Sequence, residues 1–213
     1  MKQIEKIAEW LGSGSINIFG MPFAGKDTQG ELLATALDAV RLSGGEILRN
    51  SVIPPHVQEA IDAGNLAPTD EYIDIVLPYL SKQEFAGKPL ILSSVGRWKG
   101  EEDGVIAACE QSGHPIKAVI YLNIDESMIK HRLHESQKSG SRGERADDAE
   151  HLLETRLTEY RNKTLPVIEH YRSMGLLIEV DANHGIDDVQ QAVVAALVEH
   201  AASAYGASDF GSA

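Results

Sequence analysis

Two glycines and a lysine near the start of the chain have the spacing of a phosphate-binding loop. Gly20 and Gly25 are separated by four residues, and Lys26 follows directly. Glycines let the main chain turn tightly, so that successive N–H groups and the amino end of the next helix point at one anion. Lys26 then reaches the outer phosphates of a nucleotide. The hydroxyl group comes two places after the lysine, at Thr28, because Asp27 lies between them.

Hydrophobic runs and the breaks between them predict the elements that hold this loop. Strands are expected at 15–19, 40–43, 89–93, 118–122 and 176–180. Helices are expected at about 4–11, 31–38, 46–51, 56–63, 70–82, 101–112, 126–137 and 187–200, with a long one after residue 147 that is interrupted near Pro166. This alternation favours a parallel α/β sheet with right-handed crossovers. Ligands of such sheets bind at the carboxyl ends of the strands, where the phosphate loop lies.

Composition excludes several classes of protein. The 213 residues are 43% hydrophobic and 24% charged, which is ordinary for one domain with a full core. The net charge of −13 argues against a general binder of nucleic acid or anionic membranes. No apolar run is long enough to span a bilayer, and the amino-terminal residues do not resemble a signal peptide. We expect a cytoplasmic protein whose single cysteine, Cys109, fills the core.

Arginines near strand ends are informative in a chain this acidic. Phosphoryl transfer requires alignment of donor and acceptor, with positive charge around the transferring oxygens, and a guanidinium group binds phosphate through two donors. The candidates are Arg49, Arg97, Arg132, Arg142, Arg145 and Arg156. For each, a solvated surface arginine is the alternative. Arg97 is the strongest, because one short loop separates it from the strand at 89–93.

From about Ile16 to Val189 the sequence resembles the adenylate kinase branch of the nucleoside monophosphate kinases. Gly20-Met-Pro-Phe-Ala-Gly-Lys-Asp-Thr-Gln29 is similar to the phosphate loop of that family, which also has its hydroxyl group two places after the lysine. The other similar segments are Ser43-Gly-Gly-Glu-Ile-Leu-Arg49, Asp62-Ala-Gly-Asn-Leu-Ala-Pro68, Leu90-Ile-Leu-Ser-Ser-Val-Gly-Arg97, Arg145-Ala-Asp-Asp148 and Thr164-Leu-Pro-Val-Ile168.

The resemblance implies an α/β P-loop three-layer sandwich with a five-stranded parallel sheet. It divides one kinase domain into a core, a mobile acceptor lobe, a mobile lid and a tail. The core comprises 1–42, 73–133 and 148–200, the acceptor lobe 43–72, the lid 134–147 and the tail 201–213. The short lid lacks the cysteine set of zinc-bearing relatives, so no structural zinc is expected. The implied reaction is reversible phosphoryl transfer from Mg-ATP to a nucleoside monophosphate.

The resemblance also assigns roles to individual residues. Those expected to bind ATP are Gly20, Pro22, Ala24, Gly25, Lys26, Asp27, Thr28 and Arg132. Those expected to bind the acceptor are Gly44, Arg49, Ala67, Arg97 and Glu101. The catalytic cations are Lys26, Arg97, Arg145 and Arg156.

The magnesium site departs from the family pattern. Ser93 stands where the family has an aspartate that helps to hold magnesium through water. We expect Asp27 or Glu46 to compensate, together with Thr28, by binding Mg²⁺ mostly through the nucleotide and water. Asp27 has an alternative role without a metal, as an acid that faces the positive end of a helix.

The acceptor site departs from the pattern as well. Gly44 replaces a threonine, and Glu101 corresponds, within one residue, to a glutamine that reads adenine. A carboxylate only accepts hydrogen bonds, so Glu101 suits guanine better than adenine; alternatively, it begins a solvated helix. Ser136 replaces a lid arginine, for which Arg142 is the expected substitute.

We therefore predict a monomeric, adenylate-kinase-like enzyme that acts on ATP and AMP and has no nucleic-acid or membrane partner. The alternatives are a kinase for GMP, CMP or UMP, a P-loop kinase for another small acceptor, and a nucleotide-binding module whose catalytic rate has been lost. Ser93 favours the module. The many arginines argue against it, because binding alone does not require so many cations.

Overall fold

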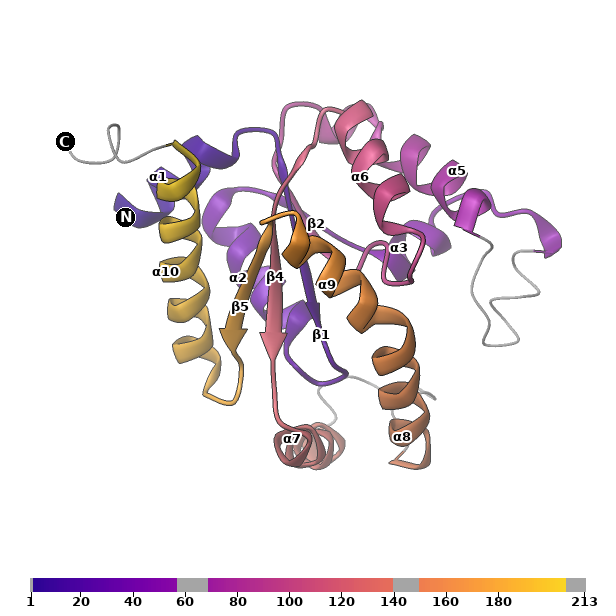
Figure 1. Ribbon diagram of the computed structural model, residues 1–213, viewed down its shortest axis with the longest axis vertical. Coiled ribbons are helices and arrows are strands. Elements are labelled where there is room, and N and C mark those ends of the chain that lie inside the picture. Colours follow the sequence, from indigo (N-terminus) through magenta and orange to yellow (C-terminus); the bar gives the residue numbers. More distant parts are fainter. Residues whose placement is uncertain (1, 57–68, 140–149, 206–213) are drawn as a thin grey trace.

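A computed structural model describes residues 2–56, 69–139 and 150–205 (Figure 1). Strands and helices alternate along the chain, as predicted. The strands are β1 Ser15–Gly20, β2 Val40–Ser43, β3 Leu90–Ser93, β4 Ile116–Asn123 and β5 Leu177–Asp181. The α-helices within the described ranges are α1 Lys2–Leu11, α2 Lys26–Leu37, α3 Gly44–Arg49, α5 Thr69–Leu80, α6 Glu102–Gln111, α7 Glu126–Ser139, α8 Glu150–Glu159, α9 Leu165–Ser173 and α10 Ile186–Tyr205.

The strands form one parallel sheet of five in the order β2-β3-β1-β4-β5, which confirms the predicted fold class. In the register of the central strand, Ile18 pairs with Ser93 of β3 and Gly20 pairs with Leu122 of β4. Because all strands are parallel, their carboxyl ends share one edge, and α7 lies beyond that edge in Figure 1. The loops that follow β1 and β3 therefore begin side by side.

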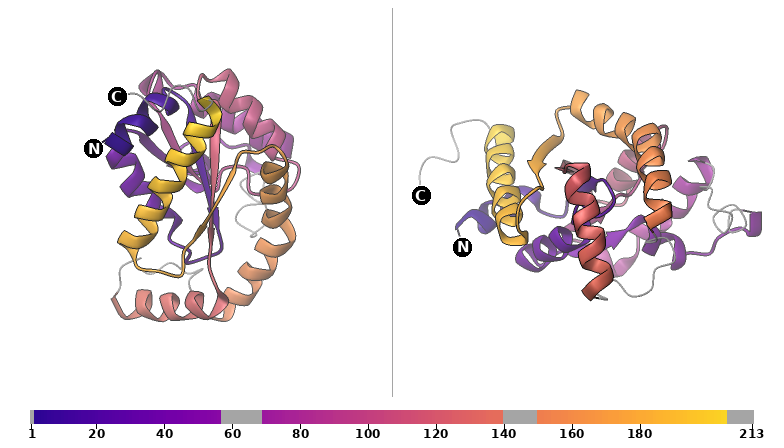
Figure 2. Two further views of the ribbon diagram at one scale, coloured as in Figure 1. Left: turned by 60° about the vertical axis from the view of Figure 1, so that its left-hand side comes forward. Right: turned by 90° about the horizontal axis from the view of Figure 1, so that it is seen from below.

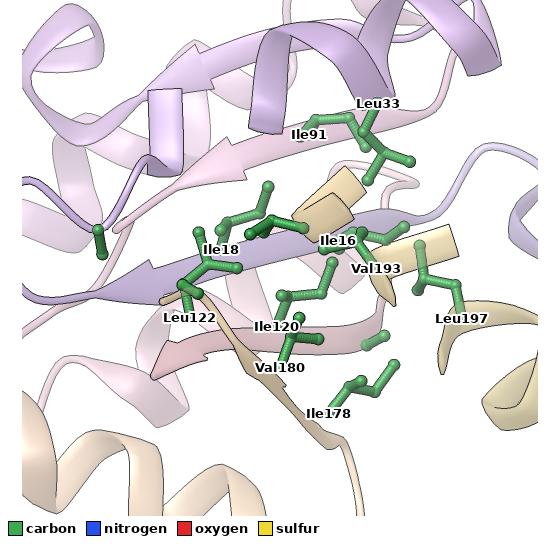
Figure 3. Packing of buried hydrophobic residues seen from close by; sticks show 14 of the residues in the cluster. Ile16, Ile18, Leu33, Ile91, Ile120, Leu122, Ile178, Val180, Val193 and Leu197 are labelled. Carbon is green, nitrogen blue, oxygen red and sulfur yellow. The ribbon is translucent and has the colours of Figure 1, made fainter. Parts of the chain in front are cut away.

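Helices cover both faces of the sheet, because side chains alternate along each strand. Ile16 and Ile18 of β1 face the layer of α1, α2 and α10, whereas Phe19 faces the layer of α5, α6 and α9 (Figure 2). In Figure 3, Leu33 of α2 and Val193 of α10 lie over the first of these faces. The two apolar layers explain why β1 is buried along its whole length.

Two expected helix boundaries are refined by the structure. The long helix after residue 147 is interrupted as predicted, by the π-helix η3 (Tyr160–Thr164), after which Pro166 occupies the first turn of α9. A proline fits there because the first turn needs no N–H donor. Helix α10 runs to Tyr205, past its expected end at about 200, because Ala201 is fully buried in the core. The expected helix at 56–63 and the end of the tail lie outside the described residues.

Cys109 of α6 is fully buried, and burial raises the pKa of its thiol to about 12. Both facts agree with the expected packing role. None of the helices in the described ranges combines the length and the apolar character that crossing a bilayer requires.

Candidate active site

The phosphate loop connects the end of β1 to the start of α2. A Cβ atom at Gly20 would stand 2.9 Å from the carbonyl oxygen of Leu122, so the strand leaves the sheet where only glycine fits. Gly25 then takes a left-handed conformation (φ 95°) directly before Lys26, the first residue of α2. The loop residues Pro22 and Ala24 are buried. The tight turn therefore brings the amino end of α2 to the carboxyl edge of the sheet.

Lys26 bends back over this loop. Its Nζ atom donates to the carbonyl oxygens of Gly20, at 2.8 Å, and Met21, at 3.0 Å. The ammonium group is half-buried and positioned by the main chain of the loop itself. Thr28, one residue beyond Asp27, is exposed in the first turn of α2.

Arg132 of α7 joins the phosphate loop to the loop between β5 and α10. Its Nη1 atom donates to the carbonyl oxygens of Phe23 (3.2 Å) and Ala24 (3.1 Å). Its Nη2 atom donates to those of Ala182 (2.6 Å) and His184 (3.0 Å). Burial lowers the pKa of Arg132, but a guanidinium group keeps its charge in proteins. Both terminal nitrogens are thus committed to the main chain.

Asp27 meets the end of β3. The Ser93 hydroxyl group donates to Oδ1 of Asp27 at 3.1 Å, although the two residues belong to different elements. Asp27 also lies in the first turn of α2, where a carboxylate is favoured by the helix dipole. A carboxylate therefore stands at the end of β3, although the strand itself ends in a serine.

Arg41 of β2 was not among the candidate arginines. It pairs with three carboxylates, at 3.6 Å to Asp27, 2.8 Å to Glu31 and 3.5 Å to Glu46. Glu46 in turn forms a capping box with Ser43 at the start of α3. The spacing Ser43-x-x-Glu46 is a sequence signal for that box, but no local signal indicates the pairing of Arg41 across two helices.

The loop after β3 is held by a buried asparagine and a glycine. Asn17 of β1 donates to the carbonyl oxygen of Val95 at 2.7 Å and accepts from its N–H at 3.3 Å. Gly96 has φ 68°, and a Cβ atom there would lie 2.6 Å from Val105. Arg97 follows and is exposed. Within the described residues, its guanidinium group has no hydrogen bond or ion pair.

Glu101 ends this loop, directly before α6, and is only 3% exposed. Its Oε2 atom accepts from the N–H of Trp98 at 3.1 Å. Burial raises the pKa of its carboxyl group to about 7, opposed in part by that hydrogen bond and by the positive charge of Arg97. The alternative that Glu101 begins a solvated helix is therefore wrong. The loop after β3 buries the side chain of Glu101 instead of exposing it to solvent.

Arg156 of α8 contacts Phe23 of the phosphate loop. Its guanidinium carbon lies 5.8 Å from the centre of the Phe23 ring, within the range of a cation–π contact. Further along the same helical run, Nζ of Lys163 lies 3.9 Å from the centre of the Trp98 ring. The carbonyl oxygen of Lys163 accepts from the N–H of Lys99 at 3.1 Å. The run of α8 and η3 therefore contacts both the phosphate loop and the loop after β3.

Several expected site residues cannot be placed. Ala67, Arg142 and Arg145 lie outside the described residues, and so does much of the lid, which leaves the zinc expectation a prediction. Gly44 begins α3 and Arg49 ends it, but the side chain of Arg49 is not described. In the parts of the chain that the structure describes, no three His, Cys, Asp or Glu side chains gather as a ready-made metal site.

Comparison with known proteins identifies the family. The sequence model of the family described as adenylate kinase matches residues 18–176. A protein named adenylate kinase from Prochlorococcus marinus is 34% identical over 175 residues, which cover 80% of this chain and 91% of the relative. The adenylate kinase of Corynebacterium urealyticum is 30% identical, covering 84% of this chain and 97% of its own. That of Methanosarcina barkeri is 29% identical, covering 88% and 100%.

The family match covers most of the chain and includes the phosphate loop, the loop after β3, α7 and α8. It agrees with the parallel sheet and with the cations at its carboxyl edge. The chain is a nucleoside monophosphate kinase that transfers a phosphoryl group between ATP and a nucleoside monophosphate, and it belongs to the adenylate kinase family.

Proposed function

We propose that the chain transfers the γ-phosphoryl group of Mg-ATP reversibly to AMP, which yields two molecules of ADP. The contact between Asp27 and Ser93, at 3.1 Å, carries the proposal. It joins the turn that bears Lys26 to the strand end that leads to Arg97. Phosphoryl transfer requires positive charges from both loops around one phosphorus atom, and this contact keeps the loops together.

In the proposed reaction, an oxygen of the AMP phosphate attacks the γ-phosphorus of ATP. The bond from that phosphorus to the β,γ-bridging oxygen breaks, and ADP leaves with the electron pair. Lys26, Arg97 and Arg156 stabilise the negative charge on the transferring group. Arg145 and Arg49 are assigned the same kind of role, toward the transferring group and the acceptor phosphate respectively.

The donor binds at the loop from Gly20 to Thr28, whose N–H groups face the phosphates. Arg132 is proposed to support the nucleotide base with the flat face of its guanidinium group, because both terminal nitrogens already bind carbonyl oxygens. Ile186, two residues beyond His184, is 58% exposed and supplies apolar surface for the same base.

Mg²⁺ fits the donor set at the start of α2. The Asp27 carboxylate is 47% exposed beside Ser93, and Glu46 lies on the other side of Arg41. Carboxylate oxygens suit Mg²⁺, which keeps several waters and binds largely through nucleotide phosphates. The ion of Mg-ATP supplies positive charge to the phosphate oxygens. Asp27→Ala or Glu46→Ala should weaken the magnesium dependence of turnover; unchanged dependence in both variants excludes this role.

AMP is proposed as the acceptor because Glu101 is partly protonated at neutral pH. A pKa of about 7 leaves much of the carboxyl group neutral, and a neutral carboxyl group both donates and accepts, as a glutamine does. The neutral form fits the ring nitrogen and amino group of adenine. The ionised form accepts only, and thus fits the two donors of guanine. The same residue makes GMP the second candidate acceptor.

The segments 43–72 and 134–147 are proposed to close over the acceptor and the donor. Closure excludes water, so that ATP is not lost to hydrolysis. This division remains a proposal, because much of both segments lies outside the described residues.

One coupled assay tests the proposed function. ATP is offered with AMP, GMP, CMP or UMP, with and without Mg²⁺, at pH 6 and pH 8. Magnesium-dependent turnover that is fastest with AMP supports the proposal, whereas preference for GMP at both pH values supports the second candidate. Tight ATP binding without transfer to any acceptor supports the nucleotide-binding module that Ser93 favours.

A further inference from the structure

Arg41 lies on the edge strand β2 and faces three carboxylates from two helices. Its Nη1 atom lies 3.6 Å from Asp27 and its Nε atom 2.8 Å from Glu31, both on α2. Its Nη2 atom lies 3.5 Å from Glu46 on α3. Each nitrogen of the planar guanidinium group thus has a carboxylate of its own. Lysine has no such fork, so only arginine can hold the three acids in this arrangement.

Two of these carboxylates stand beside residues of the proposed reaction. Asp27 follows Lys26 directly, and the Ser93 hydroxyl group holds its Oδ1 atom at 3.1 Å. Glu46 accepts from the N–H of Ser43 at 2.9 Å, in the capping box that begins the helix of Arg49. Arg41 therefore connects the turn of the donor-side lysine with the helix of the acceptor-side arginine.

The charges explain why this connection matters to anionic substrates. Without Arg41, the three carboxylates would lie near one another without a compensating positive charge, and Asp27 follows directly after the lysine of the phosphate loop. Like charges repel one another more strongly near a protein surface than in bulk water, because the effective dielectric constant is lower there. The side chain of Arg41 is 23% exposed and that of Asp27 47%, so the ion pairs themselves stabilise the fold only weakly.

We propose that Arg41 is a positioning residue that holds the Asp27 and Glu46 carboxylates in place and thereby sets the charge beside the phosphate loop. Arg41 acts through these acids and does not touch the substrate. The proposal rests on the proposed function only in that the phosphate loop receives nucleotide phosphates. Neither the identity of the acceptor base nor the rate of transfer enters it.

The test measures binding of a non-hydrolysable ATP analogue with Mg²⁺ by calorimetry, for R41Q, R41K and E31Q. R41Q should weaken binding about tenfold, because unbalanced carboxylates repel the phosphates. R41K should recover part of the loss, since it restores the charge without the fork. E31Q is the matched control: it removes the shortest pair of Arg41 but leaves Asp27 and Glu46 paired, and Glu31 is 71% exposed. The affinity of the E31Q variant for the analogue should change less than about twofold.

A double-mutant cycle shows whether Arg41 acts through Asp27. In a protein that already carries D27N, R41Q should weaken analogue binding clearly less than it does in the wild type. The Asp27 carboxylate, which R41Q would leave without its positive partner, is already absent there. The loss in R41Q should also shrink as salt rises from about 0.05 to 0.5 M, since ions screen half-exposed charges. Thermal denaturation of each variant shows whether it is folded.

Unchanged analogue binding in R41Q overturns the proposal, as does an equal loss in the wild-type and D27N backgrounds. A loss in E31Q as large as that in R41Q overturns it too, because any broken surface pair would then have the same effect. If the wild-type protein binds the analogue but transfers phosphate to no acceptor, the proposed function fails. The role of Arg41 is still decided by the binding data.

Discussion

The cations on the two sides of the site are held in different ways. On the proposed donor side, Lys26 and Arg132 donate to main-chain carbonyl oxygens, including those of Gly20 and Ala24. On the proposed acceptor side, Arg97 is exposed, and its guanidinium group has no hydrogen bond or ion pair with the described residues. Lys26 and Arg132 therefore contribute to the fold as well as to the proposed site, whereas Arg97 makes no such contact with the described residues. Substitution of Arg132 should therefore lower stability, whereas substitution of Arg97 should lower activity alone.

The largest effect on activity is expected from Arg97→Ala. Turnover with AMP should fall about 10²–10³-fold, because a positive charge that is proposed to stabilise the transferring group is lost. The melting temperature should stay within about 2 °C of the wild type, since exposed side chains without partners stabilise little. Steady-state kinetics and thermal denaturation check both parts. Lys99→Ala removes an exposed cation from the same loop and should leave turnover nearly unchanged.

Arg132→Ala, unlike Arg97→Ala, should lower the stability of the fold as well as ligand binding. Its loss leaves the carbonyl oxygens of Phe23, Ala24, Ala182 and His184 without a charged donor. We expect the free energy of unfolding in urea to fall by about 2–4 kcal/mol, together with weaker ATP binding.

The control for Arg132→Ala is Lys130→Ala, an exposed cation on the same helix, which should cost less than about 0.5 kcal/mol. A variant of Arg132 as stable as the wild type would contradict the structural role of donor-side cations.

Glu101→Gln tests the acceptor side through pH. The folded state raises the pKa of Glu101 to about 7, so it binds more protons than the unfolded chain between the ordinary pKa near 4.5 and 7. The stability that this proton contributes is present below 4.5 and is lost as pH rises through about 7. At pH 8 the Glu101→Gln variant should therefore be more stable than the wild type, by on the order of 1–3 kcal/mol.

The same substitution should flatten the pH dependence of AMP binding. In the wild type, KM for AMP should rise between pH 6 and pH 8 as Glu101 ionises; in the variant it should stay level. Glu110→Gln, on the exposed side of α6, is the control and should keep the wild-type profile. A level wild-type profile would mean that Glu101 does not contact the acceptor base.

The smallest effect is expected from Lys163→Met, which removes the cation–π contact with Trp98. The free energy of unfolding should fall by about 0.5–1 kcal/mol, and KM for AMP should change less than about threefold. Lys163→Arg keeps a cation over the ring and should behave as the wild type. An effect as large as that of Arg97→Ala would show that the loop depends on this contact for its position.

Local sequence signals predicted most of the fold. Continuous apolar runs such as 89–93 marked the buried strands, because a parallel strand covered on both faces needs no polar alternation. The interruption near Pro166 was predicted from the chemistry of proline itself. The helical segment from 201 to 205 was missed, because an alanine-rich end has little pattern until Ala201 packs against the core.

The site was less predictable from local signals. Glu101 has the polar character of an exposed residue at a helix start, but the loop pinned by Asn17 and Gly96 folds it under. Arg41 has the character of a solvated residue on an edge strand, until α2 and α3 bring it three carboxylates. In both cases the side chain meets its surroundings only once separate elements have packed: α2, β2 and α3 around Arg41, and β1 against the loop of Glu101.

The sequence by itself determined the order of strands and helices, the phosphate loop and the arginine after β3, because these depend on residues within one short segment. Only the tertiary structure decided which charges meet. The hydrogen bond between Ser93 and Asp27, the commitment of Arg132 to carbonyl oxygens and the near-neutral pKa of Glu101 each arise where separate elements pack together. Electrostatic interactions depend on distance and burial, and the folded chain alone sets both.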